Sequence, residues 1–132
     1  MTLKNYVIDA MIDELGCMDG MTIYGCDLGY AIFSEANCNG SYTCNTQESI
    51  EWIGKYFSEL GPVVEDTIAN IGENIFPNPF NNPEAFQVAI MLEVSSQLIA
   101  QCSSTMKNWD EGIELTKETI ETIIKELKEL KD

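Results

Sequence analysis

The sequence predicts a helix-rich α+β fold, a single domain over residues 1–132 with a small antiparallel β-hairpin or three-stranded sheet. Apolar residues recur at helical spacing near both ends of the chain and after residue 46. Between Gly20 and Cys44, glycine, aromatic and β-branched residues replace that rhythm. A chain of 132 residues, 45% of them hydrophobic, can bury one core but not two.

The first half of the chain is expected to hold one helix and the strands. Thr2 suits an N-cap and Gly16 suits a stop, so a helix is predicted over 3–15. Strands are predicted at 28–37 and 41–45, with a shorter one at 21–25. Asn39-Gly40 falls where a two-residue hairpin turn requires positive φ.

The second half is expected to be helical. Asn45 and Glu48 form a capping pair for a helix that Gly61-Pro62 ends, and a further helix follows to Ile71. After a proline-rich loop over 72–83, only Glu93 is charged between Phe86 and Met106, which predicts a central, buried helix. A last helix begins at Thr116, where Leu115 and Ile120 are spaced as a hydrophobic staple. The predicted core comprises Trp52, Ile53, Phe57, Phe86, Ile90, Leu98, Ile120, Ile123 and Leu127.

The side chains that are missing exclude several kinds of chemistry. Histidine and arginine are absent, and all seven cations are lysines. Ser-His and Cys-His nucleophile pairs therefore cannot form within the chain. The chain also lacks the guanidinium group of arginine, which binds phosphate through two hydrogen bonds. The five cysteines include no Cys-x-x-Cys pair, so we expect no metal site, no cofactor and no catalytic residue. An odd number of cysteines without an export signal indicates reduced thiols in a cytoplasm.

Charge is the main functional lead. The chain carries 22 acids against 7 lysines, a formal net charge of −15. Residues 1–106 hold 14 acids and 2 lysines, a net charge of −12, and no cation lies between Lys4 and Lys55. This sign opposes direct binding of nucleic acid or of an anionic membrane. No apolar run approaches the ~20 residues that span a bilayer.

The excess of acids favours a partner with a basic surface, such as a nuclease effector. Carboxylates on a rigid surface can occupy phosphate positions and block a nucleic-acid channel without any chemistry. The alternative is that the charge only keeps an acidic protein soluble. The candidate partner-binding residues are Asp9, Asp13, Asp19, Asp27, Glu35, Glu48, Glu51 and Glu59.

Three segments carry a resemblance to short acidic proteins of unknown function encoded by phages and prophages. They are Gly40-Ser41-Tyr42-Thr43-Cys44-Asn45-Thr46, Asn78-Pro79-Phe80-Asn81-Asn82-Pro83-Glu84-Ala85-Phe86-Gln87-Val88, and Asn108-Trp109 leading to Glu114-Leu115-Thr116. In size and acidity the chain is also similar to anti-CRISPR proteins, which bind a nuclease effector and often compete with nucleic acid. The resemblance implies a non-enzymatic inhibitor, a DNA mimic, in the cytoplasm of an infected bacterium.

A second hypothesis is an accessory or assembly protein that acts as a homo-oligomer. The uncharged helix over 86–106 or the strand over 28–37 would then meet its copy in a homodimer. An enzyme would have to rely on cysteine, tyrosine and carboxylates, and no pair of acids is set apart from the others. We therefore expect no enzymatic activity.

Overall fold

The computed structural model describes residues 2–23, 28–29, 31–32, 46–71, 83–102 and 113–132, with backbone only for Thr46, 62–71 and Ile113. In chain order its elements are α1 (Leu3–Leu15), β1 (Thr22–Ile23), α3 (Thr46–Ile71), α4 (Pro83–Ile99), β2 (Ile113–Glu114) and α5 (Lys117–Leu130). Residues 28–29 and 31–32 are also helical. Within these described ranges, no helix combines the length and the apolar character needed to cross a membrane.

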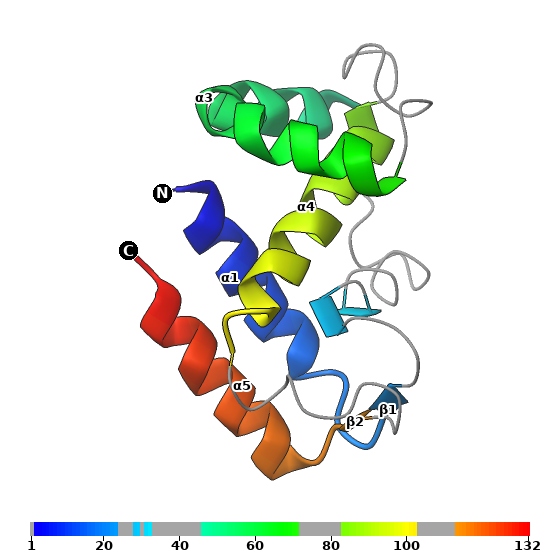
Figure 1. Cartoon of the computed structure of the whole chain (residues 1–132), viewed down its shortest axis with the longest axis vertical. Helices are drawn as coiled ribbons and strands as arrows, with labels where there is room; N and C mark the ends of the chain where they lie inside the picture. Colours follow the sequence, from blue (N-terminus) through cyan, green and yellow to red (C-terminus); the bar gives the residue numbers. More distant parts are fainter. Residues whose placement is uncertain (1, 24–27, 30, 33–45, 72–82, 103–112) are drawn as a thin grey trace.

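Helix α4 is the centre of the molecule. It contacts α1, α3 and α5, and its most extensive packing is against α3. Figure 1 shows α1 and α5 running antiparallel, α3 lying across one end, and the two chain termini on the same side. Eleven of the 17 residues of α4 are buried, which confirms the central, buried helix predicted from the near absence of charge. The helix ends at Ile99 rather than at Met106, and 103–106 lie outside the described residues.

The predicted α+β class is wrong, because the described chain is a bundle of helices. Its only strand pairing joins two residues to two, with Thr22 opposite Glu114 and Ile23 opposite Ile113, too little to form a sheet layer. The predicted strand over 28–37 begins with helical residues at 28–29 and 31–32. The rest of that strand and the one over 41–45 lie outside the described residues. At the described positions, the packing of Gly29 against the backbone of α4 overrides the local strand preference.

The helix boundaries follow local capping chemistry. The Oγ1 of Thr2 accepts the N–H of Asn5 at 3.1 Å, and the Oγ1 of Thr116 accepts the N–H of Thr119 at 3.2 Å. Both predicted caps are therefore confirmed. Helix α3, in contrast, continues through Gly61-Pro62, where two helices were predicted. Figure 1 shows its ribbon turning back part-way along, as expected where a proline removes a hydrogen bond from a helix.

Eight of the nine predicted core residues are buried, and the exception is Phe57. Its side chain is 63% exposed, while Trp52, Ile53 and Tyr56 on the same helix are buried. The rings of Tyr6, Trp52 and Tyr56 form one cluster, with centroids 5.4 to 5.9 Å apart, that joins α3 to α1. In this described region Trp52 Nε1 and Tyr56 Oη are buried without a hydrogen-bond partner. Ring packing and burial therefore stabilise this contact in place of polar pairing.

Among the described glycines, Gly29 is the one at which an added Cβ would clash with another element. A Cβ at this position would lie 2.5 Å from Ser96 N and 2.6 Å from both Ser95 C and Ser95 O. These are backbone atoms of α4, so they cannot move aside as the end of a flexible side chain could. The short helical segment around Gly29 thus packs directly on the backbone of the central helix.

We expect Gly29→Ala to destabilise the fold by about 1–3 kcal/mol, because the added methyl group has no space. Urea unfolding followed by circular dichroism measures the change. The matched control is Gly54→Ala on α3, where a Cβ would meet nothing within 4 Å. The control is expected to raise stability by up to about 1 kcal/mol through helix propensity. A stable Gly29→Ala protein would contradict the close approach.

Candidate functional site

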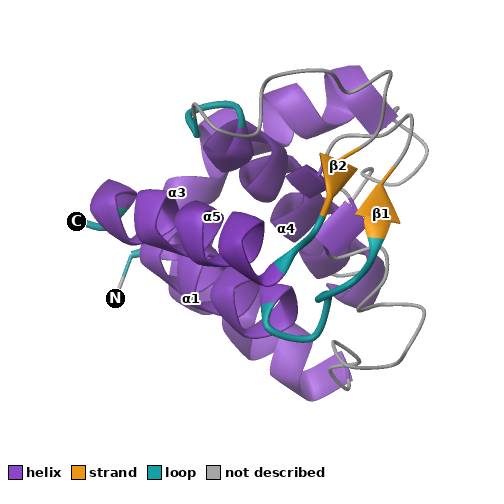
Figure 2. Ribbon diagram, turned by 90° about the horizontal axis from the view of Figure 1, so that it is seen from below, coloured by secondary structure: helices purple, strands orange, loops and turns teal. Residues whose placement is uncertain are grey.

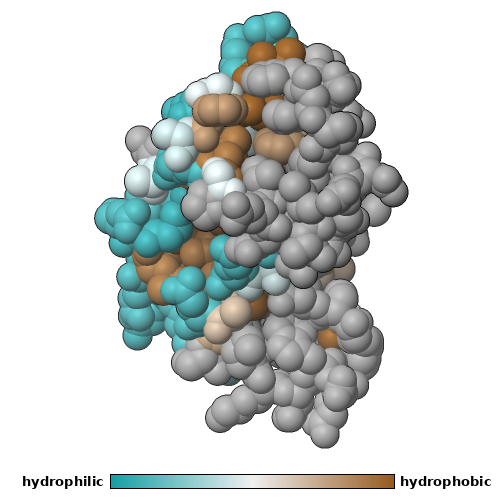
Figure 3. All heavy atoms as spheres, turned by 45° about the horizontal axis from the view of Figure 1, so that its top comes forward, coloured by the Kyte–Doolittle hydropathy of each residue, from teal (hydrophilic) through white to brown (hydrophobic). Residues whose placement is uncertain are grey.

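The six predicted partner-binding acids that the structure describes do not form one face. Asp13 and Asp19 are exposed at the end of α1, whereas Glu48 and Glu51 are exposed in the first turns of α3. Figure 1 places these two groups at opposite ends of the molecule. Figure 3, which looks from the α3 side, shows brown apolar areas between the teal areas of its described surface, not a continuous hydrophilic face. Asp27 and Glu35 lie outside the described residues.

The carboxylate of Asp9 forms an ion pair within the chain. Lys131 Nζ lies 2.7 Å from Asp9 Oδ1, and Lys4 Nζ lies 2.8 Å from Asp132 Oδ1. The side chain of Asn5 forms two further hydrogen bonds with the backbone of Asp132. Its Oδ1 accepts the N–H at 3.0 Å, and its Nδ2 donates to the carbonyl at 3.5 Å. These contacts hold the end of the chain against α1, so Asp9 contributes to the fold at this position.

A second group of carboxylates lies where α1 ends and α5 begins. Gly20 N–H donates to Leu115 O at 2.8 Å, and Leu115 N–H donates to Met21 O at 2.7 Å. Gly20 has a φ of 87°, a backbone conformation that residues with a side chain rarely adopt. Figure 2 shows the teal connections that lead into β1 and out of β2 close to each other. We name the acids of this junction the acidic end: Asp13, Glu14, Asp19, Glu114 and Glu118.

The acidic end is poorly neutralised. Glu14 is half-buried and the other four acids are exposed, and Lys117 is the single lysine in the described stretches that form this junction. The last turn of α1 contains no basic residue, so Asp13 and Glu14 lie beside the negative end of the helix dipole. Burial, and then the neighbouring charge of Asp13, raise the pKa of Glu14 above its usual value. Burial is thus the main reason that the charged form of Glu14 is disfavoured, and the negative charge of Asp13 adds to it.

Sequence reasoning found only part of this site. Glu114 and Glu118 were left out of the candidate set because they belong to the lysine-rich end of the chain. Asp13 and Glu14 both lie in the last turn of a helix, and that turn contains no basic residue. This pattern could have identified them as a pair from the sequence.

The described cysteines do not supply an activated nucleophile pair. Cys102 is buried, and burial followed by the charge of Glu126 raises its pKa to about 11, so it stays a thiol at neutral pH. Cys17 is exposed, and its Sγ lies 3.9 Å from Asp13 O. The other three cysteines lie outside the described residues. In the part of the chain that the structure describes, no three acids or cysteines are grouped to hold a metal ion.

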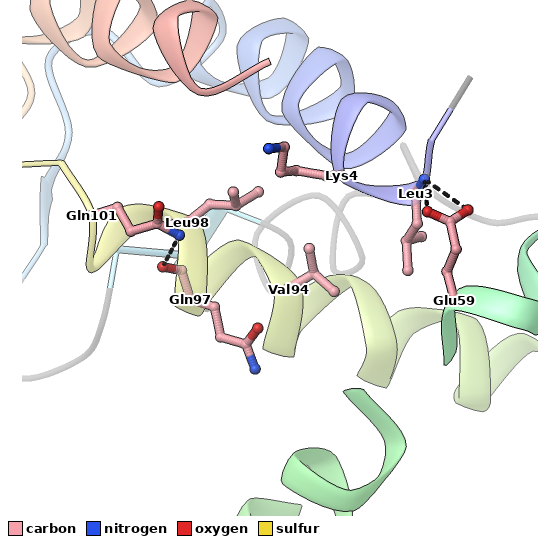
Figure 4. Close-up of a pocket in the computed structure, with 7 residues that line it drawn as sticks. All are labelled: Leu3, Lys4, Glu59, Val94, Gln97, Leu98 and Gln101. Carbon is pink, nitrogen blue, oxygen red and sulfur yellow. Dashed lines mark hydrogen bonds between the residues drawn. The ribbon is translucent and has the colours of Figure 1, made fainter. Parts of the chain in front are cut away.

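A pocket of about 220 Å³ opens between the start of α1, the middle of α3 and the second half of α4. Its lining residues, drawn in Figure 4, are Leu3, Lys4, Glu59, Val94, Gln97, Leu98 and Gln101. The carboxylate of Glu59 accepts the N–H of Leu3 with both oxygens, at 3.2 and 3.3 Å. Glu59, the last of the predicted acids, therefore bonds to the first turn of α1 at the edge of this pocket.

No protein-family model, no curated protein and no solved structure matches this chain.

The raised pKa of Glu14 predicts a pH dependence of stability. A carboxyl whose pKa is higher in the folded than in the unfolded state favours folding when protonated, and this benefit is lost as pH rises through the folded pKa. We expect Glu14→Gln to stabilise the protein at neutral pH by up to about 0.5 kcal/mol, after solvent screening. The gain should vanish below the pKa of an ordinary glutamate. Urea unfolding of both proteins at several pH values measures it.

Asp13→Asn is the companion variant. Removing the neighbouring charge should lower the pKa of Glu14 without restoring its ordinary value, because burial is the larger cause. An NMR titration of the Glu14 side-chain carboxyl carbon measures this pKa. An unchanged pKa in Asp13→Asn would show that the two carboxylates do not interact.

Proposed function

We propose that this chain is a non-enzymatic acidic inhibitor that binds and blocks a basic, nucleic-acid-handling bacterial complex. The proposed source is a phage or prophage, and the proposed mode of action is anti-CRISPR-like mimicry of nucleic acid. The observation that supports the proposal is the acidic end, where exposed carboxylates lie at a helix C-terminus with little neutralising charge.

The arrangement of acids at the end of α1 is energetically unfavourable. Each carboxylate beside the negative end of a helix dipole is unfavourable by roughly 0.3–1 kcal/mol, and like charges add to that cost. A lysine in the last turn of α1 would relieve the strain, but this turn contains Asp13 and Glu14. Local rules are broken most often at functional sites, which favours a role in binding over general solubility.

The proposed mode of binding needs no reaction. The acidic end is held by backbone hydrogen bonds between residues 20–21 and 115, so its carboxylates keep their spacing. A partner whose channel is lined by lysine and arginine would meet these carboxylates in place of phosphates. Charge also increases the rate of association and makes binding sensitive to salt.

Charge reversal tests the proposal. The variant Asp13→Lys/Asp19→Lys/Glu118→Lys should lose at least about tenfold in affinity for the basic complex that wild type captures from bacterial lysate, consistent with a few close charge pairs. The control Glu48→Lys/Glu51→Lys reverses two exposed acids at the other end of the molecule. Binding to the purified partner is measured between about 50 and 500 mM salt, because the screening of charge–charge interactions increases strongly over this range.

Two outcomes would refute the proposal. The first is an affinity that does not change with salt or with reversal of the acidic end. The second is a captured partner that binds nucleic acid equally well with and without this protein, measured by gel shift. Circular dichroism of each variant shows whether the fold is kept.

A homo-oligomeric accessory protein is the second candidate, and one observation favours it. Among the described residues Phe57 is the large apolar side chain that remains exposed, and Gly54 and Gly61 lie near it on α3. Of the surfaces predicted from the sequence, the described helix α4 contacts three other helices, and residues 28–29 and 31–32 of the predicted strand are helical.

Light scattering over a wide concentration range distinguishes the two candidates. If the chain self-associates through Phe57, the wild type should double its mass and Phe57→Ser should remain monomeric at the same concentration. The substitution should cost little stability, because the ring is mostly exposed. A wild type that stays monomeric throughout rules out the second candidate.

A further inference from the structure

We infer that the pocket beside Glu59 is a socket for one long cationic side chain, a lysine or an arginine, of the partner. This inference rests on the proposed function, because it requires a partner with a basic surface. It assigns a role to Glu59 and to the neutral residues around it, none of which belongs to the acidic end.

The floor of the pocket suits an aliphatic stem. Leu3, Val94 and Leu98 are between 3% and 6% exposed, so they present the edge of the core to the pocket. A volume of about 220 Å³ is several times the ~30 Å³ that one water molecule occupies in liquid, and it can hold a single extended side chain but not a helix. Lysine and arginine bury such methylene stems on apolar surfaces while their heads stay near polar groups.

The charges at the rim suit a cation. Glu59 is exposed, and the single N–H of Leu3 shared by its two oxygens leaves further lone pairs for a donor. Lys4 is the pocket's only cation, and its Nζ is bound to Asp132 Oδ1 at 2.8 Å. Figure 4 shows the Lys4 side chain directed away from Glu59. The ion pair with Asp132 therefore holds the ammonium of Lys4 away from Glu59 and reduces its repulsion of an entering cation.

Gln97 on α4 and Gln101 in the turn that follows add neutral polar groups to the pocket. Gln101 Nε2 donates to Gln97 O at 3.4 Å, and Gln97 Nε2 donates to Glu93 Oε1 at 3.4 Å. Both side chains thus bring neutral amide groups to the lining of the pocket. Because these amides are neutral, they add no charge to that of Glu59, which lies toward the other end of the lining (Figure 4).

A partly desolvated ion pair in a pocket contributes more to binding than one on an open rim. The socket would thus anchor the partner, whereas the acidic end steers it.

NMR titration of the full chain with small probes tests the inference. The cationic probes are Nα-acetyl-lysine amide and Nα-acetyl-arginine amide, and the neutral controls of similar length are Nα-acetyl-norleucine amide and Nα-acetyl-citrulline amide. We expect the cationic probes to bind at least about tenfold more tightly than their neutral controls, equivalent to about 1.4 kcal/mol. The expected shifts are at the backbone amide of Leu3 and the side-chain amides of Gln97 and Gln101.

Glu59→Gln is the test variant and Glu51→Gln is its control, since both remove one charge from an exposed position on α3. Glutamine can still accept the N–H of Leu3, so α1 should keep its first turn. Glu59→Gln should reduce cationic binding to the level of the neutral probes, and Glu51→Gln should leave it unchanged. Comparison of the lysine and arginine probes identifies which head group the socket prefers.

Three outcomes would overturn the inference: equal binding of cationic and neutral probes, equal losses in the two variants, or shifts confined to the acidic end. Such results leave the proposed function standing if reversal of the acidic end still weakens partner binding. Loss of partner binding only in Glu59→Gln would support the socket and refute the role of the acidic end.

Discussion

The burial of α4 is the constraint on which the rest of the structure depends. A helix with a single charged residue between Phe86 and Ile99 cannot remain in water, so other elements must cover it. Helices α1, α3 and α5 provide that cover, and the segment at Gly29 packs directly on its backbone. Because the apolar side chains are buried, the acidic side chains lie mostly on the surface. Their positions there can be selected for binding without disturbing the core.

Charge in this protein is divided between structure and surface. Asp9, Asp132 and Glu59 make contacts that hold α1 to the end of the chain and to α3. Asp13 and Asp19, in contrast, remain exposed at the junction of α1 and α5. A net charge of −15 is therefore a poor guide to the size of a binding surface, because part of it stabilises the fold.

The sequence predicted what local rules govern and missed what distant contacts decide. The caps at Thr2 and Thr116 and the buried α4 follow from residues close in the chain. Phe57 was misplaced because the buried stripe of α3 runs through Trp52, Ile53, Tyr56 and Leu60, and a residue one position beyond Tyr56 is rotated about 100° around the helix. The partner of β1 is about 90 residues away, and the ion pair of Asp9 spans 122 positions. No local pattern could reveal either contact.

The hydrogen bonds between Asn5 and Asp132 bear on the order in which the helices pack during folding. These hydrogen bonds span 127 positions, nearly the whole chain, and the entropy lost in closing a loop grows with its length. The pair α3 and α4 lies closer together in sequence and shares the largest contact, so its formation shortens the loop that α1 and α5 must close. We therefore expect α5 to dock late in folding, so that the part of α4 in contact with α5 stays uncovered until then.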